Sequence, residues 1–592
     1  MSQSGTMPES AACVDVLIIG AGPVGLVTAF QLAKFGSVSV RIVEKHAKSM
    51  QDAYGRAITL FPRTSEMLDQ LGLADALLQD CFACRDTVTY ASDGREVPGR
   101  GWTFMSHMKN TTFDFALVLR QKFQEEIFRN AMGKYNVQVE SPIELISASV
   151  DHNIPLTDYR VKAVLLDHRT GNHETVKCKY LVGCDGGRSS VRQLFGIPFE
   201  GSKTEDKWVR IDGQITTNLP KPRTYCSIES PTHGNVLWAA LDHGATRIGY
   251  AFTDDRINAY SNFDEAAAVQ EAIAAVKPFD LKFDRVDWWT IYKVGQRIAK
   301  SFFLDECVFL AGDACHTHSS GAAQGMNTGM HDAVNLAWKM SVVLRGLAKP
   351  SLLETYQAER LPNVQRLIQY DKDISRLMAN RLPEGWQGDP DADVNVVLGK
   401  LMDEAEPFNS GLGISYEIQK DNPLNVKSSN SSRMLEVQPG MRGPDITLYR
   451  PGTFESTRLI RELPNEACFR VLVFAASRSG AFDGPEKPEP VYQSLKGSPV
   501  LQLLVAKGCL TFATILPERA SSPYELLGDQ PLGRVYYDAK GDDPAYRCYG
   551  MNGWGGIVVL RPDGWIGTML SLQSQSVSEL EGYFRGIFYV EP

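Results

Sequence analysis

The segment DVLIIGAGPVGLVTAFQLAKFGSVSVRIVEK (residues 15–45) determines the fold of this chain. A short apolar run leads into a glycine-rich turn, a stretch with helical periodicity follows, and a second apolar run ends at Glu44. This order predicts a strand, a tight turn, a helix and a second, parallel strand. It is the βαβ unit of a Rossmann-type, dinucleotide-binding domain.

The three glycines of the turn, Gly20, Gly22 and Gly25, have the spacing of a dinucleotide-binding fingerprint. One glycine permits a tight turn, one lets the backbone approach a pyrophosphate, and one lets the helix pack closely on the strand. The phosphate charge then lies at the helix N-terminus. Glu44, with Lys45 beside it, ends the second strand, where a carboxylate accepts hydrogen bonds from a ribose and would repel a 2′-phosphate. We expect these five residues to bind a dinucleotide.

The composition is that of an ordinary globular protein, with 592 residues, 43% of them hydrophobic and 22% charged. The net charge is −9 and the lysines and arginines are scattered, so the sequence predicts no basic patch for binding nucleic acid. The polar stretch before residue 15 has no basic signal region, and the apolar run after it is too short and glycine-rich to span a bilayer. The 11 cysteines are an odd number spread thinly, which favours reduced thiols and a cytoplasmic location.

A second informative stretch, VFLAGDACHTHSSGAAQGMNTGM (308–330), places Asp313, Cys315, His316 and His318 within six residues. These are the residue types that bind zinc or iron. Histidines at i and i+2 could both face a metal only in an extended strand, and a glycine-rich loop flanks them here. We therefore expect no metal at this stretch. We expect instead that the Asp313 carboxylate has its role beside the glycine-rich turn.

Three motifs in order resemble those of one enzyme family: GAGPVG followed by Glu44, CDGGRSSVR (184–192) and AGDACHTHSSGAAQGMNTGMHDAVNLAWKM (311–340). The family is that of the FAD-dependent aromatic hydroxylases of the p-hydroxybenzoate hydroxylase class, and the phenol 2-monooxygenase branch is the most similar. The resemblance covers nearly the whole chain. It implies an α/β protein with a Rossmann-type FAD-binding domain, an interleaved β-rich substrate domain and a C-terminal thioredoxin-like domain.

The resemblance also implies how FAD would be bound. The carboxylate of Asp313 would hold a hydroxyl of the ribityl chain, and backbone groups would contact the pyrimidine end of the flavin, where negative charge builds on reduction. Further contacts would come from the side of the flavin and from the DG motif, which serves both FAD and NAD(P)H. The implied residues besides Asp313 are Arg56, Arg120, Gln121, Asp185, Gly325, Met326 and Asn327.

The implied reaction is hydroxylation of a phenolic ring with NADPH, or NADH, and O2 through a flavin C4a-hydroperoxide. The chain has no second GxGxxG, so the nicotinamide would visit a site without its own Rossmann unit. Arg247 and Tyr250 align with an arginine and a tyrosine of the phenol hydroxylases, and Tyr292 is a further candidate for binding and ionising the substrate. Two positions depart from the family: Ser320 replaces a proline, and Ile58 stands where an acidic residue is found.

The patterns place the domain boundaries as follows: 1–200 and 296–380 form the FAD-binding domain with a long helix, 201–295 the substrate domain, 381–432 a linker, and 433–592 the C-terminal domain. In this last domain, apolar runs that include VLQLLVA (500–506) predict strands, and Ser576 with Glu579 predicts a capping box at the start of the final helix. We expect this domain to support a homodimer.

Three alternatives stay open from the sequence. The same flavin chemistry could serve Baeyer-Villiger insertion or dearomatising hydroxylation in secondary metabolism. The C-terminal domain could carry thiol-disulfide activity, although it lacks a CxxC motif. The chain could also be a flavin-binding dimer without catalysis.

Overall fold

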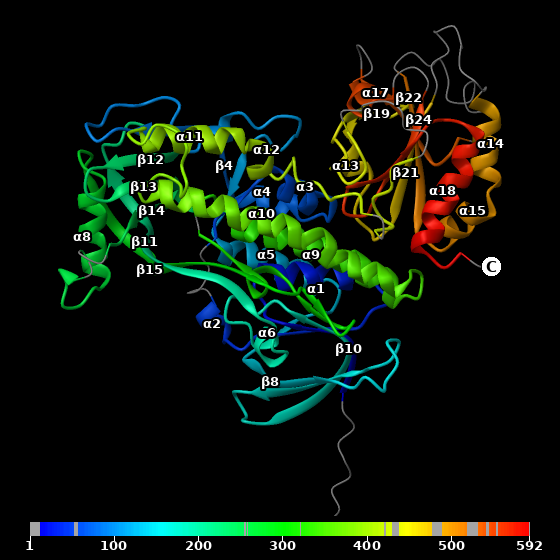
Figure 1. The fold of residues 1–592 in the computed structure, drawn as a ribbon, viewed down its shortest axis with the longest axis horizontal. Helices are drawn as coiled ribbons and strands as arrows, with labels where there is room; N and C mark the ends of the chain where they lie inside the picture. The colour runs from blue at the N-terminus through cyan, green and yellow to red at the C-terminus, as the bar shows by residue number, and fades with distance from the viewer. Residues whose placement is uncertain are drawn as a thin grey trace, which may run out of the picture.

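The computed structural model describes residues 12–51, 57–253, 256, 258–319, 321–419, 422–428, 437–475, 488–517, 531–539, 544–551 and 555–590. Two residues that the sequence singles out, Arg56 and Ser320, lie outside these ranges. Within them no helix combines the length and the apolar character that crossing a membrane requires. Figure 1 shows three parts, with a β-rich lobe at one end, the C-terminal domain at the other, and two long helices running between them.

The first sheet confirms the predicted Rossmann-type unit. Its strands follow the order β16-β17-β10-β1-β2-β7, and β17, β10, β1, β2 and β7 are parallel neighbours. Helix α1 connects β1 to β2 and begins at Pro23, where a proline without an N–H is tolerated. The elements are β1 Ala12–Ile19, β2 Val40–Val43, β7 Val139–Glu140, β8 Ile143–Val150, β9 Val161–Asp167, β10 His173–Gly183, β16 Phe303–Leu304, β17 Val308–Leu310, α1 Pro23–Phe35, α2 Lys48–Gln51 and α6 Ser190–Leu194.

Further helices and a small sheet complete the FAD-binding part. The three-stranded sheet has the order β3-β6-β4, and α9 packs along α1 with α10 beside it. In Figure 1, α9 and α10 cross the middle of the molecule. The elements are β3 Thr59–Leu60, β4 Phe82–Cys84, β6 Ala116–Val118, α3 Pro62–Gln70, α4 Ala74–Asp80, α5 Gln121–Gly133, α9 Gln324–Leu344 and α10 Glu354–Met378.

The second sheet is antiparallel apart from its β5 edge and forms the β-rich lobe, with the order β18-β15-β11-β14-β13-β12-β5. It takes β5 and β18 from outside 201–295, so parts of the FAD-binding region complete it. One face packs on helix α8 and the other faces the loop before α9. The elements are β5 Thr87–Tyr90, β11 Phe199–Thr217, β12 Tyr225–Ser230, β13 Gly234–Ala240, β14 Thr246–Ala251, β15 Leu281–Ala299, β18 His316–Thr317 and α8 Glu265–Ala275.

The C-terminal domain has its own sheet, β20-β19-β23-β22-β21-β24-β25. Strands β21, β22 and β23 are parallel, and β24 and β25 form an antiparallel hairpin beside β21. Its description as thioredoxin-like stays a prediction. The elements are β19 Thr447–Tyr449, β20 Ser456–Arg458, β21 Phe469–Phe474, β22 Leu510–Leu516, β23 Arg534–Asp538, β24 Gly556–Leu560, β25 Ile566–Leu570, α13 Leu459–Glu462, α14 Pro488–Gly497, α15 Pro499–Ala506, α17 Pro544–Cys548 and α18 Ser574–Ile587.

A buried ionic cluster joins the C-terminal domain to the two long helices. Arg561, after β24, donates to Glu359 of α10 at 2.9 Å and to Asp563 at 2.7 Å. Lys339 of α9 donates to the same Glu359 at 2.8 Å. The side chains of all four residues are at most 1% exposed. Because unpairing any of these buried charges is costly, the two domains are firmly attached to each other.

Two predictions for the C-terminal domain are wrong. VLQLLVA is not a strand but most of helix α15, because Ser498 caps it by accepting a hydrogen bond from the N–H of Leu501 at 3.2 Å, and Leu501 and Leu504 bury one helical face. The predicted capping box is absent, since α18 begins at Ser574 and Glu579 accepts a hydrogen bond from Ser428 instead, at 2.8 Å.

The segment 381–432, predicted as a linker, contains helices α11 Val394–Glu404 and α12 Glu406–Asn409. Asp393 caps α11 by accepting a hydrogen bond from the N–H of Asn395 at 2.9 Å. Leu398 and Met402, four residues apart, bury the inner face of α11 against the core between the FAD-binding part and the second sheet.

Candidate functional site

The glycine turn between β1 and α1 is shaped for a phosphate. A Cβ atom on Gly20, whose φ is +101°, would lie 2.4 Å from the carbonyl oxygen of Cys184, and one on Gly25 would lie 2.0 Å from the carbonyl oxygen of Gly20. The protein's own backbone therefore requires these two glycines. A Cβ on Gly22 would meet no atom of the described residues within 4 Å, so they leave the space beside it open at the N-terminus of α1.

Glu44 lies at the end of β2 beside this turn. Its carboxylate accepts hydrogen bonds from the N–H of Ala21 at 3.0 Å and from the N–H of His46 at 2.9 Å. The carboxylate is thereby held between the glycine turn and the next loop, where a ribose would reach it. The adjoining Lys45 is exposed. Binding of a nucleotide by Glu44 and Lys45 stays a prediction that this placement supports.

Asp185 follows β10 and caps helix α6. Its Oδ2 accepts hydrogen bonds from the N–H of Ser190 at 2.6 Å and of Val191 at 3.1 Å, while its buried Oδ1 has no hydrogen-bond partner among the residues that the structure describes. Burial raises the pKa of this carboxyl, although the Ser189 hydroxyl and the backbone N–H groups oppose the shift. An unsatisfied buried oxygen is costly, which indicates a further donor such as a ligand hydroxyl.

Asp313 and the start of α9 form the second half of the site. Asp313 lies in the short 3-10 helix η3 Gly312–Ala314 and is exposed, so its carboxylate is accessible to a polyol. Gly325 and Met326 occupy the first turn of α9, where the backbone N–H groups have no carbonyl of the same helix to which they can donate. The side chain of Asn327 fixes this end of α9, because its Oδ1 accepts from the N–H of Phe61 at 2.8 Å.

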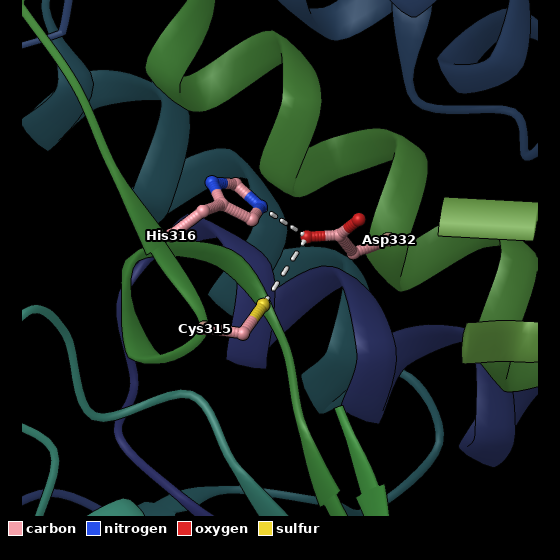
Figure 2. Close-up of side chains that lie close together, drawn as sticks. All are labelled: Cys315, His316 and Asp332. Carbon is pink, nitrogen blue, oxygen red and sulfur yellow. Dashed lines mark hydrogen bonds and ion pairs between the residues drawn. The ribbon is translucent and has the colours of Figure 1, made fainter. Parts of the chain in front are cut away.

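The cluster Cys315, His316 and Asp332 has the composition of a metal site (Figure 2). The carboxylate of Asp332 is already paired with His316 Nε2 at 2.7 Å and with Arg360 Nε at 2.7 Å, and it accepts from the N–H of Gly312 at 3.0 Å. Burial raises the pKa of the Cys315 thiol well above its usual value, so this sulfur is protonated. The group is therefore an ion-pair network that supports the loop beneath Asp313.

Arg120 and Gln121 lie where β6 meets α5. The guanidinium of Arg120 donates to Asp242 at 2.6 Å and to Asp287 at 2.9 Å, which ties the FAD-binding part to the second sheet. The Oε1 of Gln121 accepts from the N–H of Ala57 at 3.2 Å. Both side chains thus serve structural contacts, and their contact with a flavin stays a prediction.

The face of the second sheet that meets the loop before α9 is the candidate substrate surface. Trp208 and Tyr225 pack there on Ala322, and Tyr292 lies beside them. The hydroxyl of Tyr292 donates to the carbonyl oxygen of His318 at 2.7 Å, so this tyrosine links the sheet to the loop. Tyr292 therefore lies in the predicted region, although its part in catalysis stays a prediction.

Arg247 and Tyr250 do not lie on the same face. Arg247 faces the loop side and makes two hydrogen bonds to Asp212, at 2.6 and 2.8 Å. Tyr250 lies on the opposite face, where its hydroxyl donates to the carbonyl oxygen of Ala268 in α8 at 2.9 Å. Side chains alternate along a strand, so residues three apart point in opposite directions. This placement, away from the loop before α9, does not support Tyr250 as a substrate residue, and that role stays an untested prediction.

Sequence reasoning missed Arg210. It lies on β11 opposite Gly249, where a built Cβ would collide with its guanidinium at 2.1 Å. Its side chain shares the face of Trp208 and Asp212, as the alternation of these three residues indicates. Burial, together with the charge of Arg247, lowers the pKa of Arg210 to about 10, so it stays cationic at neutral pH.

A small cavity lies beside the first turns of α9. It has room for about one water molecule, which is far below the volume that an aromatic ligand needs. Three buried side-chain atoms at its wall, Thr64 Oγ1, His331 Nδ1 and Asn409 Oδ1, have no hydrogen-bond partner in the described part of the chain. A buried water would satisfy them. This cavity is therefore not the substrate site.

These features together fit FAD. The open turn at Gly22 fits a pyrophosphate, and Glu44 fits a ribose. Asp313 and the Oδ1 of Asp185 fit the ribityl and diphosphate groups. The N-terminus of α9 fits an electron-rich edge of the ring. Arg56 cannot be placed in this arrangement, because it lies outside the described residues.

Two family models match the chain. Residues 13–371 match the FAD binding domain, and residues 519–591 match the phenol hydroxylase C-terminal dimerisation domain. A phenol 2-monooxygenase of Aspergillus fumigatus is 28% identical over 98% of this chain and 97% of its own length. A 3-hydroxybenzoate 4-monooxygenase of Comamonas testosteroni is 32% identical, and the match spans 68% of this chain and 65% of that relative.

Solved structures agree on the fold. The flavin-dependent monooxygenase PieE, in complex with FAD and substrate, has a TM-score of 0.71 at 20% identity and covers 97% of this chain and 99% of its own. Aklavinone-11 hydroxylase, in complex with FAD and aklavinone, has a TM-score of 0.70 at 21% identity and covers 97% and 98%. At these identities the likeness establishes the shared architecture alone, with an FAD-binding domain, a second sheet and a C-terminal domain.

Proposed function

The chain belongs to the FAD-binding family of aromatic monooxygenases, and from this premise we propose that it hydroxylates a phenolic compound with NADPH and O2. FAD, when bound and reduced by the nicotinamide, activates O2 and supplies one oxygen atom to the ring. The protein's own residues bind FAD, orient the ring, exclude water and favour the ionised phenol.

The glycine turn, Glu44 and Asp313 would hold FAD in an extended form between β1 and α9. Figure 1 shows α1, the helix that follows β1, and α9 within the same central part of the molecule. The sequence contains no second dinucleotide fingerprint, so NADPH would bind transiently at the surface of this part. The family is the ground for choosing NADPH over NADH.

The substrate would bind on the sheet face between β11, β15 and the loop before α9. The observation that carries this proposal is the buried cation Arg210 among Trp208, Tyr225 and Tyr292, next to the start of α9. A free phenol has a pKa near about 10 and is neutral at pH 7, and a nearby buried cation favours the phenolate. The phenolate is the more electron-rich ring and the better acceptor of an oxygen atom.

A substrate screen tests this proposal. Purified protein with bound FAD is mixed with NADPH and a panel of simple phenols, and NADPH oxidation, hydrogen peroxide and hydroxylated product are measured together. At least one phenol should accelerate NADPH oxidation with product formed in place of peroxide. Ring expansion or a dearomatised product would replace the proposal by one of the alternatives above, and no stimulation by any phenol would contradict it.

The C-terminal domain is proposed to form a homodimer. Its match to a dimerisation domain supports this, and so does Phe454, which is 63% exposed and stacks on Tyr537 with ring centroids 5.7 Å apart. Exposed aromatic rings of this kind are common at subunit interfaces. Light scattering should give twice the chain mass, and Phe454→Ser should shift the equilibrium toward the monomer.

The 11 cysteines, none in a disulfide, support a cytoplasmic location.

A further inference from the structure

The imidazole of His318 is buried beside the start of α9. Its side chain is 3% exposed, and its Nε2 has no hydrogen-bond partner in the described part of the chain. A Cβ built on Gly325 would lie 3.7 Å from this Nε2, so the nitrogen faces the first turn of α9. Buried polar atoms are almost always satisfied, and a lone nitrogen at a helix start indicates a missing ligand.

The rest of the imidazole is firmly held. Its Nδ1 lies 2.7 Å from the carbonyl oxygen of Ser319 and must donate to it, because a carbonyl accepts only. Tyr292 donates to the carbonyl oxygen of His318 itself at 2.7 Å. The hydrogen bond at Nδ1 therefore fixes the orientation of the ring, and Nε2 stays directed at the first turn of α9.

The counter-ion of His318 is Asp371 on α10, which is fully buried. Asp371 accepts from Gln296 at 2.8 Å, from the N–H of Ser319 at 2.7 Å and from the Ser319 hydroxyl at 2.5 Å. These donors are neutral, and within the described chain the ion pair of Asp371 is with His318, at 3.7 Å. Burial opposes a charged imidazole, but Asp371 outweighs it and raises the pKa of His318. A carboxylate buried 3.7 Å from the ring favours the imidazolium form, in which both nitrogens carry a proton.

The first turn of α9 adds donors at the same place. This helix runs for 21 residues, and its N-terminal end carries positive partial charge. The backbone N–H groups of Gly325 and Met326 have no intrahelical acceptor there. A buried N–H from His318 beside them creates a site for a group with negative charge.

We propose that His318 is a flavin-contacting residue, whose Nε2–H joins the first-turn N–H groups of α9 as a donor to the edge of the FAD ring system that becomes negative on reduction. This inference rests on the proposed function only for the identity of the cofactor. His318 would stabilise reduced FAD more than oxidised FAD. Asp371 would act as the positioning residue that keeps His318 charged.

The midpoint potential of bound FAD tests the proposal, because it reports the ratio of the affinities for reduced and oxidised FAD. His318→Leu removes a hydrogen bond from a charged donor, which contributes about 1.5–3 kcal/mol. That corresponds to about a tenfold to hundredfold change in the ratio. The potential should fall by about 30 mV for each factor of ten. His318→Gln, which keeps an N–H without the charge, should recover part of the loss.

The matched control is His233→Leu, which removes another buried histidine. His233 lies in the second sheet beside Tyr250 and bonds Glu271 at 2.8 Å, away from α9, so its loss should leave the potential unchanged. If His318→Leu loses FAD, its affinities for oxidised and reduced FAD are titrated separately. An unchanged potential, or an equal loss of both affinities, would overturn the proposal, as expected if a neutral His318 accepted a hydrogen bond from an N–H of the ring instead. A protein that hydroxylates no phenol but shows the shift would refute only the proposed function.

Discussion

Gly22→Ala separates the part of the glycine turn that serves the ligand from the part that serves the fold. In the structure Gly22 has φ −71° and ψ 179°, a conformation that alanine adopts without strain. A Cβ there would meet no atom within 4 Å in the part of the chain that the structure describes. The methyl group would project into the space assigned to the pyrophosphate of FAD.

The expected effects on stability and on binding differ greatly. The free energy of unfolding of the FAD-free protein should change by less than about 1 kcal/mol, as for other glycine-to-alanine changes at compatible positions. Binding should weaken because the methyl group displaces the phosphate from backbone N–H donors. Losing one such charged hydrogen bond, at about 1.5–3 kcal/mol, weakens FAD binding by about tenfold to hundredfold.

The assay is a titration of FAD-free protein with FAD, followed by flavin fluorescence, beside thermal unfolding of the same sample without FAD. Gly25→Ala is the matched control, because its Cβ would lie 2.0 Å from the carbonyl oxygen of Gly20 and must displace the backbone. That variant should lose stability as well as FAD. If Gly22→Ala binds FAD as tightly as the unchanged protein, the pyrophosphate does not lie at this turn and the reasoning is refuted.

The remaining expectations concern catalysis and stability. Tyr250→Phe should lower stability by about 0.5–1.5 kcal/mol by removing one buried hydrogen bond while kcat/KM stays unchanged, whereas Tyr292→Phe should lower kcat/KM; steady-state kinetics and urea unfolding distinguish them. Arg561→Met should cost about 3–5 kcal/mol in urea unfolding, because Glu359 keeps a buried charge with one partner fewer, and an unchanged stability would contradict the interdomain cluster. Arg360 and His316 lower the pKa of Asp332 to about 2 against the desolvation of burial, so its stabilising effect should be complete above about pH 4 and lost as the pH falls through 2. The stability difference between the unchanged protein and Asp332→Asn should therefore shrink over that window.

The sequence predicted most of the FAD-binding part because local patterns and long-range structure agree there. The turn at Gly20 has φ +101° and almost touches Cys184, so glycine is required and its spacing is visible in the sequence. The same holds for the start of α9, whose glycine-rich approach marks the loop. VLQLLVA misled the prediction because a run of apolar residues does not distinguish a buried strand from a buried helix, and the cap at Ser498 decides.

The substrate side was harder to predict because it depends on which face of a strand each residue occupies. Arg247 and Tyr250 differ by three positions and so lie on opposite faces, which the alternation along β14 could have indicated. Arg210 went unnoticed because it has no motif, and only the pairing of β11 with β14 brings it beside Arg247. The partner of His318, Asp371, lies 53 residues further along the chain, on α10, so no local pattern could reveal it.

Isotope incorporation tests the central claim, that this chain transfers one oxygen atom from O2 to a phenolic ring, most directly. The protein with bound FAD is incubated with NADPH, labelled dioxygen and the phenol that most stimulates NADPH oxidation, and the product is analysed by mass spectrometry. The account predicts a hydroxylated ring that carries one labelled oxygen atom, with the ring carbons otherwise unchanged. A product whose new oxygen comes from water, or peroxide as the sole fate of the labelled dioxygen with every phenol tested, would contradict it.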